Sequence, residues 1–183
     1  WNGHVPLVAS WTLAKKPGKP KVWIEPVINR DTQTITYEIR EGGDPAFERT
    51  VARGGGYCVA TNAAISLDYI RQEGQAQRLG QQLIAVVAEG ENKVYLKPDD
   101  VSETAANIDN PSNGPHGVLT GKATVSVPLY GMNQWEDLFT PRQLVALTTF
   151  SDLLPEIRER VIADAAVNGV IDDGVRLRDG GEG

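Results

Sequence analysis

The sequence predicts an α+β fold in which an antiparallel β region is followed by a helical C-terminal part. Runs rich in β-branched and aromatic residues flank short polar turns in the first half of the chain, and a stretch near the end opens with a complete set of helix-start signals. We divide the chain into a β-rich region over residues 1–97, a short helix and linker over 98–122, a helical region over 123–171 and a flexible tail over 172–183.

The first predicted element is a hairpin. Residues 21–28 and 34–40 are both rich in β-branched and aromatic side chains, and a short polar turn separates them. In the second run apolar and polar residues alternate, so one face should be buried and the other solvated. Pro26 lacks a backbone donor, which predicts that the first run is an edge strand or a bulged one.

Two further β segments follow. A short strand over 48–53 leads into the three glycines 54–56, which predict a tight backbone turn that larger residues do not tolerate. Residues 82–89 and 93–96 then predict a second hairpin, and the apolar character of its first strand indicates a central strand in the core of the β region.

Between the β region and the last helix we expect three short segments. Residues 98–106 have the pattern of a short helix with an aspartate cap, and residues 109–117 are rich in Asn, Pro and Gly and predict a linker. Residues 124–128 predict one additional strand.

The C-terminal helix has the clearest signals. Thr140 is a good N-cap, Pro141 suits the first helical position, and Gln143 completes a capping box. Pro155 predicts a kink or a break between two helices, and Asn168 with the glycine after it predicts the end. The helix has an apolar face that requires a partner surface, formed by Leu144, Leu147, Phe150 or Ser151, Leu154, Ile157, Val161 and Ala165.

Composition limits the classes of protein. The 183 residues are 40% hydrophobic and 23% charged, as in a globular protein, and no apolar run approaches the roughly 20 residues that cross a bilayer. With no signal segment and one cysteine, we expect a cytoplasmic protein without an internal disulfide. The net charge of −6 disfavours a tight grip on nucleic acid by the whole chain. Because the chain begins at Trp1, we expect an excised region of a longer protein.

Three stretches of the sequence resemble one known family. They read HVPLVASWTLAKK, GGGYCVATNAAISLDYIRQEGQAQRLGQQLIAVVAEG and YGMNQWEDLFTPRQLVALTTFSDLL, and they occur in the family's order over most of the chain. In these stretches the chain resembles the predicted adenine-specific DNA methylases that contain a zinc-ribbon insertion. The resemblance implies that the parent protein uses S-adenosylmethionine and that this chain is an internal region of it.

The resemblance also implies a zinc ribbon built from two cysteine pairs, one before the VPLV segment and one in the glycine-rich turn. Cys58 occupies the first position of the second pair, but Thr61 occupies the other, and Trp1 falls near the end of the first pair. His4 and His116 do not have ligand spacing to Cys58. We therefore expect a degenerate zinc-ribbon-like turn, held by packing and without a metal ion.

The family's chemistry is not found in this chain. The adenine methylases are expected to carry a DPPY-like motif, whereas the nearest match here, residues 44–47, lacks the second proline. The glycines 54–56 precede a cysteine turn and not a helix, so they make a poor cofactor loop. No nucleophile and base pair is recognisable. We predict no catalytic residue, no cofactor-binding residue and no cofactor in this chain.

A lysine-rich run gives candidates for DNA contact. Trp11 and Trp23 flank it, and basic residues interleaved with aromatic ones contact phosphates and stack on bases. The alternative is a solvated loop stiffened by prolines. Arg142, at the start of the last helix, adds a second candidate for an anion, with helix capping alone as its alternative. The candidates for DNA contact are Lys15, Lys16, Lys19, Lys21 and Arg142.

Two hypotheses for function follow. The first is an internal insertion or target-recognition region of a DNA adenine methyltransferase, non-catalytic by itself, whose partners are the rest of the parent protein and DNA. Trp135, Leu138 and Phe139 would then pack against the catalytic domain. The second is a protein-interaction module of a DNA-modification or defence complex, which docks through the apolar face of the C-terminal helix.

Overall fold

The computed structural model describes residues 1–170 and 174–181 and has an α+β fold. The strands are β1 (Thr12–Ala14), β2 (Val22–Asn29), β3 (Thr34–Glu41), β4 (Val51–Ala52), β5 (Gly55–Tyr57), β6 (Ala64–Ser66), β7 (Val86–Glu89) and β8 (Lys93–Leu96). The α-helices are α1 (Leu67–Gln75), α2 (Asp100–Ala106) and α3 (Pro141–Val167), and the 3₁₀ turns are η1 (Gly121–Val125), η2 (Val127–Tyr130), η3 (Glu136–Leu138) and η4 (Leu177–Asp179).

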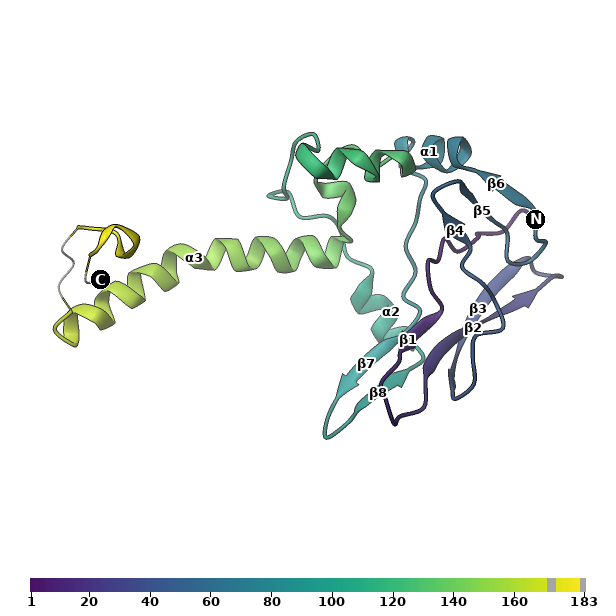
Figure 1. Ribbon diagram of the computed structural model, residues 1–183, viewed down its shortest axis with the longest axis horizontal. Coiled ribbons are helices and arrows are strands. Elements are labelled where there is room, and N and C mark those ends of the chain that lie inside the picture. The colour runs from purple at the N-terminus through teal and green to yellow at the C-terminus, as the bar shows by residue number, and fades with distance from the viewer. Residues whose placement is uncertain (171–173, 182–183) are drawn as a thin grey trace.

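All described strand pairs are antiparallel, in three small sheets ordered β1-β2-β3, β4-β5-β6 and β7-β8. Figure 1 shows the sheets gathered at one end of the molecule, with α3 projecting away from them as one long, bent helix. The predicted α+β class, with antiparallel sheets and a C-terminal helix, is therefore confirmed, but α1, which lies between β6 and β7, was not predicted from the sequence.

The hairpin predicted over residues 21–40 is present as β2 and β3. Its buried face carries Ile24, Ile35 and Tyr37, which join Trp11 and Val59 in the main hydrophobic core. Pro26 lies in the middle strand of the sheet and not in an edge strand. Pro26 is tolerated there because β1 is short and pairs with β2 only at Val22 and Trp23. No backbone carbonyl of β1 therefore lies opposite Pro26 and requires the N–H that proline lacks.

The glycine-rich turn is as tight as predicted. The strand expected over 48–53 is reduced to β4, which turns directly into β5. A Cβ atom built on Gly55, whose φ is +123°, would lie 2.5 Å from the carbonyl oxygen of Ile65, and one built on Gly56 would lie 2.5 Å from that of Thr50. Only glycine fits at these two positions.

The prediction that residues 82–89 form a central core strand is wrong. The hairpin exists as β7 and β8, but it is a separate two-stranded sheet whose side chains are largely exposed. Only the residues just before it, Ile84 and Ala85, pack against the main core. The apolar run therefore approaches the core with its first half and leaves it before pairing begins.

The segment before α3 packs on α1 through two glycines. A Cβ atom on Gly74 of α1 would lie 2.2 Å from the carbonyl oxygen of Tyr130, and one on Gly131, whose φ is +84°, would lie 2.4 Å from that of Arg71. This close approach brings η2 onto α1. The strand predicted over 124–128 is wrong, because η1 and η2 occupy that stretch and Pro128 lies in the first turn of η2.

Helix α3 begins as predicted. The N–H of Gln143 donates to the Thr140 hydroxyl at 3.4 Å, and the N–H of Thr140 donates to the Gln143 side-chain oxygen at 2.9 Å. The helix ends at Val167 with Asn168 as its C-cap, and the N–H of Val170 donates to the carbonyl of Ala165 and completes a Schellman motif.

Of the two alternatives predicted at Pro155, a kink or a break, the break does not occur, because α3 is one continuous helix of 27 residues, about 40 Å long. Figure 1 shows that this continuous helix bends along its length. A proline removes one backbone donor, and because this part of the helix is exposed, water can bond the carbonyl of Ser151 in its place.

The apolar face of α3 is buried only at its base. Leu144 is 1% exposed, whereas the residues beyond it are open to solvent. We call these exposed residues the α3 stripe, which comprises Leu147, Phe150, Leu154, Ile157 and Val161.

The remaining segments are short. Helix α2 is confirmed, with Asp99 as its N-cap, and the predicted linker over 109–117 contains no helix or strand. Of the tail predicted over 172–183, residues 172, 173, 182 and 183 lie outside the described residues, and 177–179 form η4. Within the described ranges no helix combines the length and the apolar character needed to cross a bilayer.

Candidate functional site

The four lysines predicted to contact DNA lie together in the connection between β1 and β2. Lys15, Lys16 and Lys19 are exposed, whereas Lys21 is half-buried and forms an ion pair with Asp44. The Lys21 ammonium, and to a smaller extent the charge of Lys15, lowers the pKa of the Asp44 carboxyl below its ordinary value. Part of the positive charge of this run is therefore already balanced inside the protein.

The tip of the β7–β8 hairpin lies against the same lysines. The Lys19 ammonium donates to the side-chain oxygen of Asn92 at 2.9 Å. The pKa of the Glu89 carboxyl is lowered, mainly because Lys93 donates to it, with a smaller contribution from the charge of Lys16. A negative charge thus borders the lysines, and the surface is mixed in sign.

The two tryptophans do not take part in this surface. Trp11 is 3% exposed and donates its indole N–H to the carbonyl of Glu48 at 2.8 Å, and Trp23 is 8% exposed and donates to the carbonyl of Gly42 at 2.8 Å. Their rings belong to the core, where Trp11 lies 6.4 Å from the ring of Tyr37. The prediction that they flank a base-stacking site is wrong, since a buried ring offers no face to a nucleotide.

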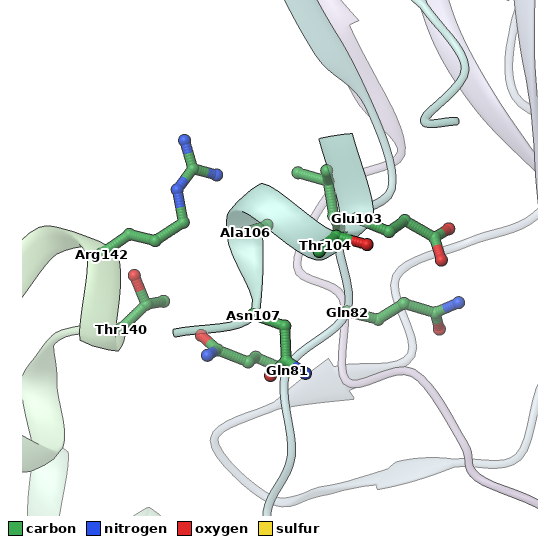
Figure 2. A pocket seen from close by; sticks show the side chains of 9 residues that line it. Gln81, Gln82, Glu103, Thr104, Ala106, Asn107, Thr140 and Arg142 are labelled. Atoms are coloured by element: carbon green, nitrogen blue, oxygen red, sulfur yellow. The ribbon is translucent and has the colours of Figure 1, made fainter. Parts of the chain in front are cut away.

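Arg142 lies on a different surface from the lysines. It lines an open cleft of about 630 Å³ between the start of α3, the C-terminal end of α2 and residues 81–83. Figure 2 shows the Arg142 side chain reaching from α3 toward the space beside α2, while Glu103 points away from it. None of the four lysines lines this cleft, so the structure does not join the five candidates into one site.

Cys58 opens a tight turn between β5 and β6. The N–H groups of Thr61 and Asn62 donate to its carbonyl at 3.3 and 2.7 Å, and its own N–H donates to the carbonyl of Ala63 at 2.8 Å. Burial of the thiol opposes ionisation, but hydrogen bonds from the Thr61 hydroxyl and from the N–H groups of Ala60 and Thr61 outweigh it and lower the pKa of Cys58.

These donors do not fit a zinc ion. Thr61 occupies the position where the resemblance implies a second cysteine, and its hydroxyl is not a thiolate or imidazole ligand of the kind that a structural zinc site uses. His116 is engaged elsewhere, with Nδ1 3.2 Å from the Glu136 carboxylate. In the part of the chain that the structure describes, no group of three or more His, Cys, Asp or Glu side chains is placed to hold a metal ion.

The structure assembles the three sequence stretches that carry the family resemblance. Thr50 ties the first stretch to the glycine-rich turn, because its hydroxyl donates to the carbonyl of Pro6 at 2.5 Å and accepts from the N–H of Val8 at 2.7 Å. Gly74 in the second stretch packs against Tyr130 and Gly131 in the third. Contacts at Thr50 and Gly74 therefore join the three quoted stretches, the last of which includes the first half of α3.

Across the described residues 1–170 and 174–181, α3 carries more exposed large apolar side chains than any other element. The five residues of the α3 stripe are between 47% and 72% exposed, and Phe150 is the most open of them. By contrast Trp135, Leu138 and Phe139 are half-buried within this chain, so they offer less docking surface than the sequence predicts.

Sequence reasoning missed two features of this arrangement. The buried role of Thr50 has no local signal, because its partners lie more than 40 positions away. The close contact of Gly74 with Gly131 also joins distant segments, and no helix was predicted over the residues of α1 that contain Gly74. Comparison with known proteins finds no match to this chain among protein families, curated proteins or solved structures.

Proposed function

We propose that this chain is an internal, non-catalytic region of a DNA adenine N6-methyltransferase, which braces the catalytic part of its parent protein through α3. The single observation that carries the docking role is the α3 stripe, five apolar side chains exposed along a helix that leaves the body of the molecule. Water-exposed apolar surface of this extent costs free energy unless a partner covers it. The methylase assignment comes from the three resembling stretches.

The parent protein would supply the chemistry. Its cofactor is expected to be S-adenosylmethionine, bound outside this chain, and no residue of this chain is assigned a catalytic or cofactor-binding role. What these residues contribute is a rigid body, closed by the contacts of Thr50 and Gly131, that sets the direction in which α3 projects.

We propose that this region contacts DNA through the exposed end of the lysine run, Lys15 and Lys16. Lys15 and Lys16 are exposed and form no ion pair among the described residues, whereas Lys21 is bound to Asp44. The contact is to phosphate and not to bases, because the neighbouring tryptophans are buried.

The test uses the parent protein with Ile157→Glu. This charge in the middle of the α3 stripe should prevent docking and lower methyl transfer from S-adenosylmethionine to adenine in DNA at least about tenfold. Circular dichroism and thermal unfolding check that the variant is folded. A parent protein that transfers no methyl group to adenine refutes the methylase assignment, and a variant as active as the unchanged parent refutes the bracing role.

The second candidate is a protein-interaction module of a modification or defence complex. The same α3 stripe favours it, because an exposed apolar helix face can accept a separate protein as well as a domain of the same chain. A pulldown that recovers one defined protein other than the parent, independent of DNA and lost with Ile157→Glu, favours this candidate over the first.

A further inference from the structure

The spacing of the α3 stripe is that of a coiled-coil seam. Its residues follow one another at intervals of three and four positions: Leu147, Phe150, Leu154, Ile157 and Val161. In heptad terms Leu147, Leu154 and Val161 take position a, and Phe150 and Ile157 take position d. A face of this form accepts another helix, whose side chains enter the spaces between these five.

Two arginines flank the seam. Arg158 falls at position e and Arg160 at position g, the two positions that face the flanks of a partner helix. Arg160 already pairs with Glu156 at 2.7 Å, whereas Arg158 forms no ion pair among the described residues. The acidic residues of the middle of α3, such as Asp152 and Glu159, fall at the outer position f.

A second copy of this chain does not supply the missing negative charge. Positions e and g along the seam hold no acidic residue, so neither a parallel nor an antiparallel pair of α3 helices could place a carboxylate beside these arginines. In a parallel pair the d position that follows Ile157 would also bring the two Asp164 carboxylates together. The flanking residues are Ala146, Ser151, Leu153, Arg158, Arg160 and Ala165.

We infer that the α3 stripe binds an amphipathic helix of a different sequence, one whose apolar stripe is flanked by Glu or Asp. Charge complementarity at Arg158 and Arg160 selects this partner over a basic helix and over a second copy. The inference rests on the docking role of α3 proposed above and does not depend on the methylase assignment. It names the chemistry that the rest of the parent protein, or a separate partner, must present.

The test uses the full 183-residue chain and two designed helical peptides that share Leu and Ile at positions a and d. One peptide carries Glu at all e and g positions and the other carries Lys. Isothermal titration calorimetry should show that the Glu peptide binds roughly tenfold more tightly than the Lys peptide, since two flanking contacts change from attraction to repulsion.

Variants separate the apolar from the electrostatic part. Arg158→Glu should remove or reverse the preference for the Glu peptide, whereas Glu159→Lys, on the outer face, should keep it. Ile157→Glu should abolish binding of both peptides. Because these side chains lie outside the core, circular dichroism should show the same fold for all three variants.

Three results overturn the inference: equal affinity for the two peptides, no binding of either, or a dimer of the chain alone in sedimentation that Ile157→Glu dissolves. Its failure is distinguishable from that of the proposed function. A chain that selects the Glu peptide but not the rest of the parent protein refutes the proposed function only. A chain that binds the parent but does not discriminate between the peptides refutes the inference only.

Discussion

Single residues decide how distant segments of this chain meet. Thr50 is fully buried, its hydroxyl bonds both the carbonyl of Pro6 and the N–H of Val8, and its own N–H donates to the carbonyl of Val8 at 2.8 Å. Gly74 and Gly131 allow two backbones to approach more closely than any side chain permits. Contacts at these three residues therefore join segments that lie far apart in the sequence.

Thr50→Val tests the first of these contacts. Valine has nearly the same shape but leaves the buried Pro6 carbonyl and Val8 N–H without a partner, which should lower the free energy of unfolding by about 2 kcal/mol. Thr50→Ser keeps the hydroxyl and should cost about 1 kcal/mol or less for the lost methyl group. Urea denaturation measures both, and equal losses would show that the hydrogen bonds contribute nothing.

Gly131→Ala tests the close approach to α1. The new Cβ atom would meet the Arg71 carbonyl in addition to the strain of a positive φ, so we expect a loss of more than about 2 kcal/mol. The control is Gly121→Ala, because Gly121 also has a positive φ of +61° but no atom near the new methyl group, and it should lose about 1 kcal/mol. Similar losses in thermal unfolding for the two variants would remove the packing argument.

Whole elements show where local signals govern the structure and where packing does. Capping boxes fix the starts of α2 and α3, so both begin where the sequence predicts. The β1–β2 connection carries the lysine run, but its charge depends on neighbours from other elements, Asp44 and the β7–β8 tip. The residue at which a helix begins is thus determined by its neighbours in the sequence, whereas the charge of a surface segment depends on residues from other elements that pack beside it.

The N-cap of α2 predicts a pH dependence. The hydroxyl of Ser102, followed by its N–H, donates to the Asp99 carboxylate and lowers the pKa of Asp99 below its ordinary value of about 4. Because the folded value is the lower one, this stabilisation of α2 is complete above about pH 4 and is lost as the pH falls through the folded pKa.

An NMR titration of the Asp99 carboxyl carbon measures this pKa. In Ser102→Ala it should move up toward the ordinary aspartate value. Thr104→Ala should leave it in place, because the Thr104 hydroxyl donates to the carbonyl of Asp100 and not to Asp99. An Asp99 that titrates identically in all three proteins would contradict the assignment of the cap.

The lysine run gives a prediction on DNA binding. Lys15→Glu combined with Lys16→Glu should weaken binding of a DNA duplex at low salt and reduce the slope of log K against log salt by about 2, since two phosphate contacts are lost. Lys21→Gln should change both much less, because its ammonium is bound to Asp44. If the double variant binds DNA like the unchanged chain, this run makes no contact with the backbone.

At the scale of the whole molecule, the fold class, the first hairpin and both ends of α3 could be predicted from the sequence, because alternation and capping are local properties. The peripheral place of β7 and β8 could not, since an apolar run does not show which half reaches the core. The burial of Trp11 also depends on distant partners. For the candidate site, the apolar face of α3 was predictable, but its exposure follows only from the direction in which the helix leaves the body.

Docking of this chain onto the rest of its parent protein through the α3 stripe is the proposed role that one binding measurement tests most directly. Isothermal titration calorimetry of the chain with the remaining part of the parent measures this directly, for the unchanged chain, for Ile157→Glu and for the outer-face control Glu159→Gln. We expect binding that is lost with Ile157→Glu and kept with Glu159→Gln. Absence of binding by the unchanged chain, or equal binding by all three, would contradict it.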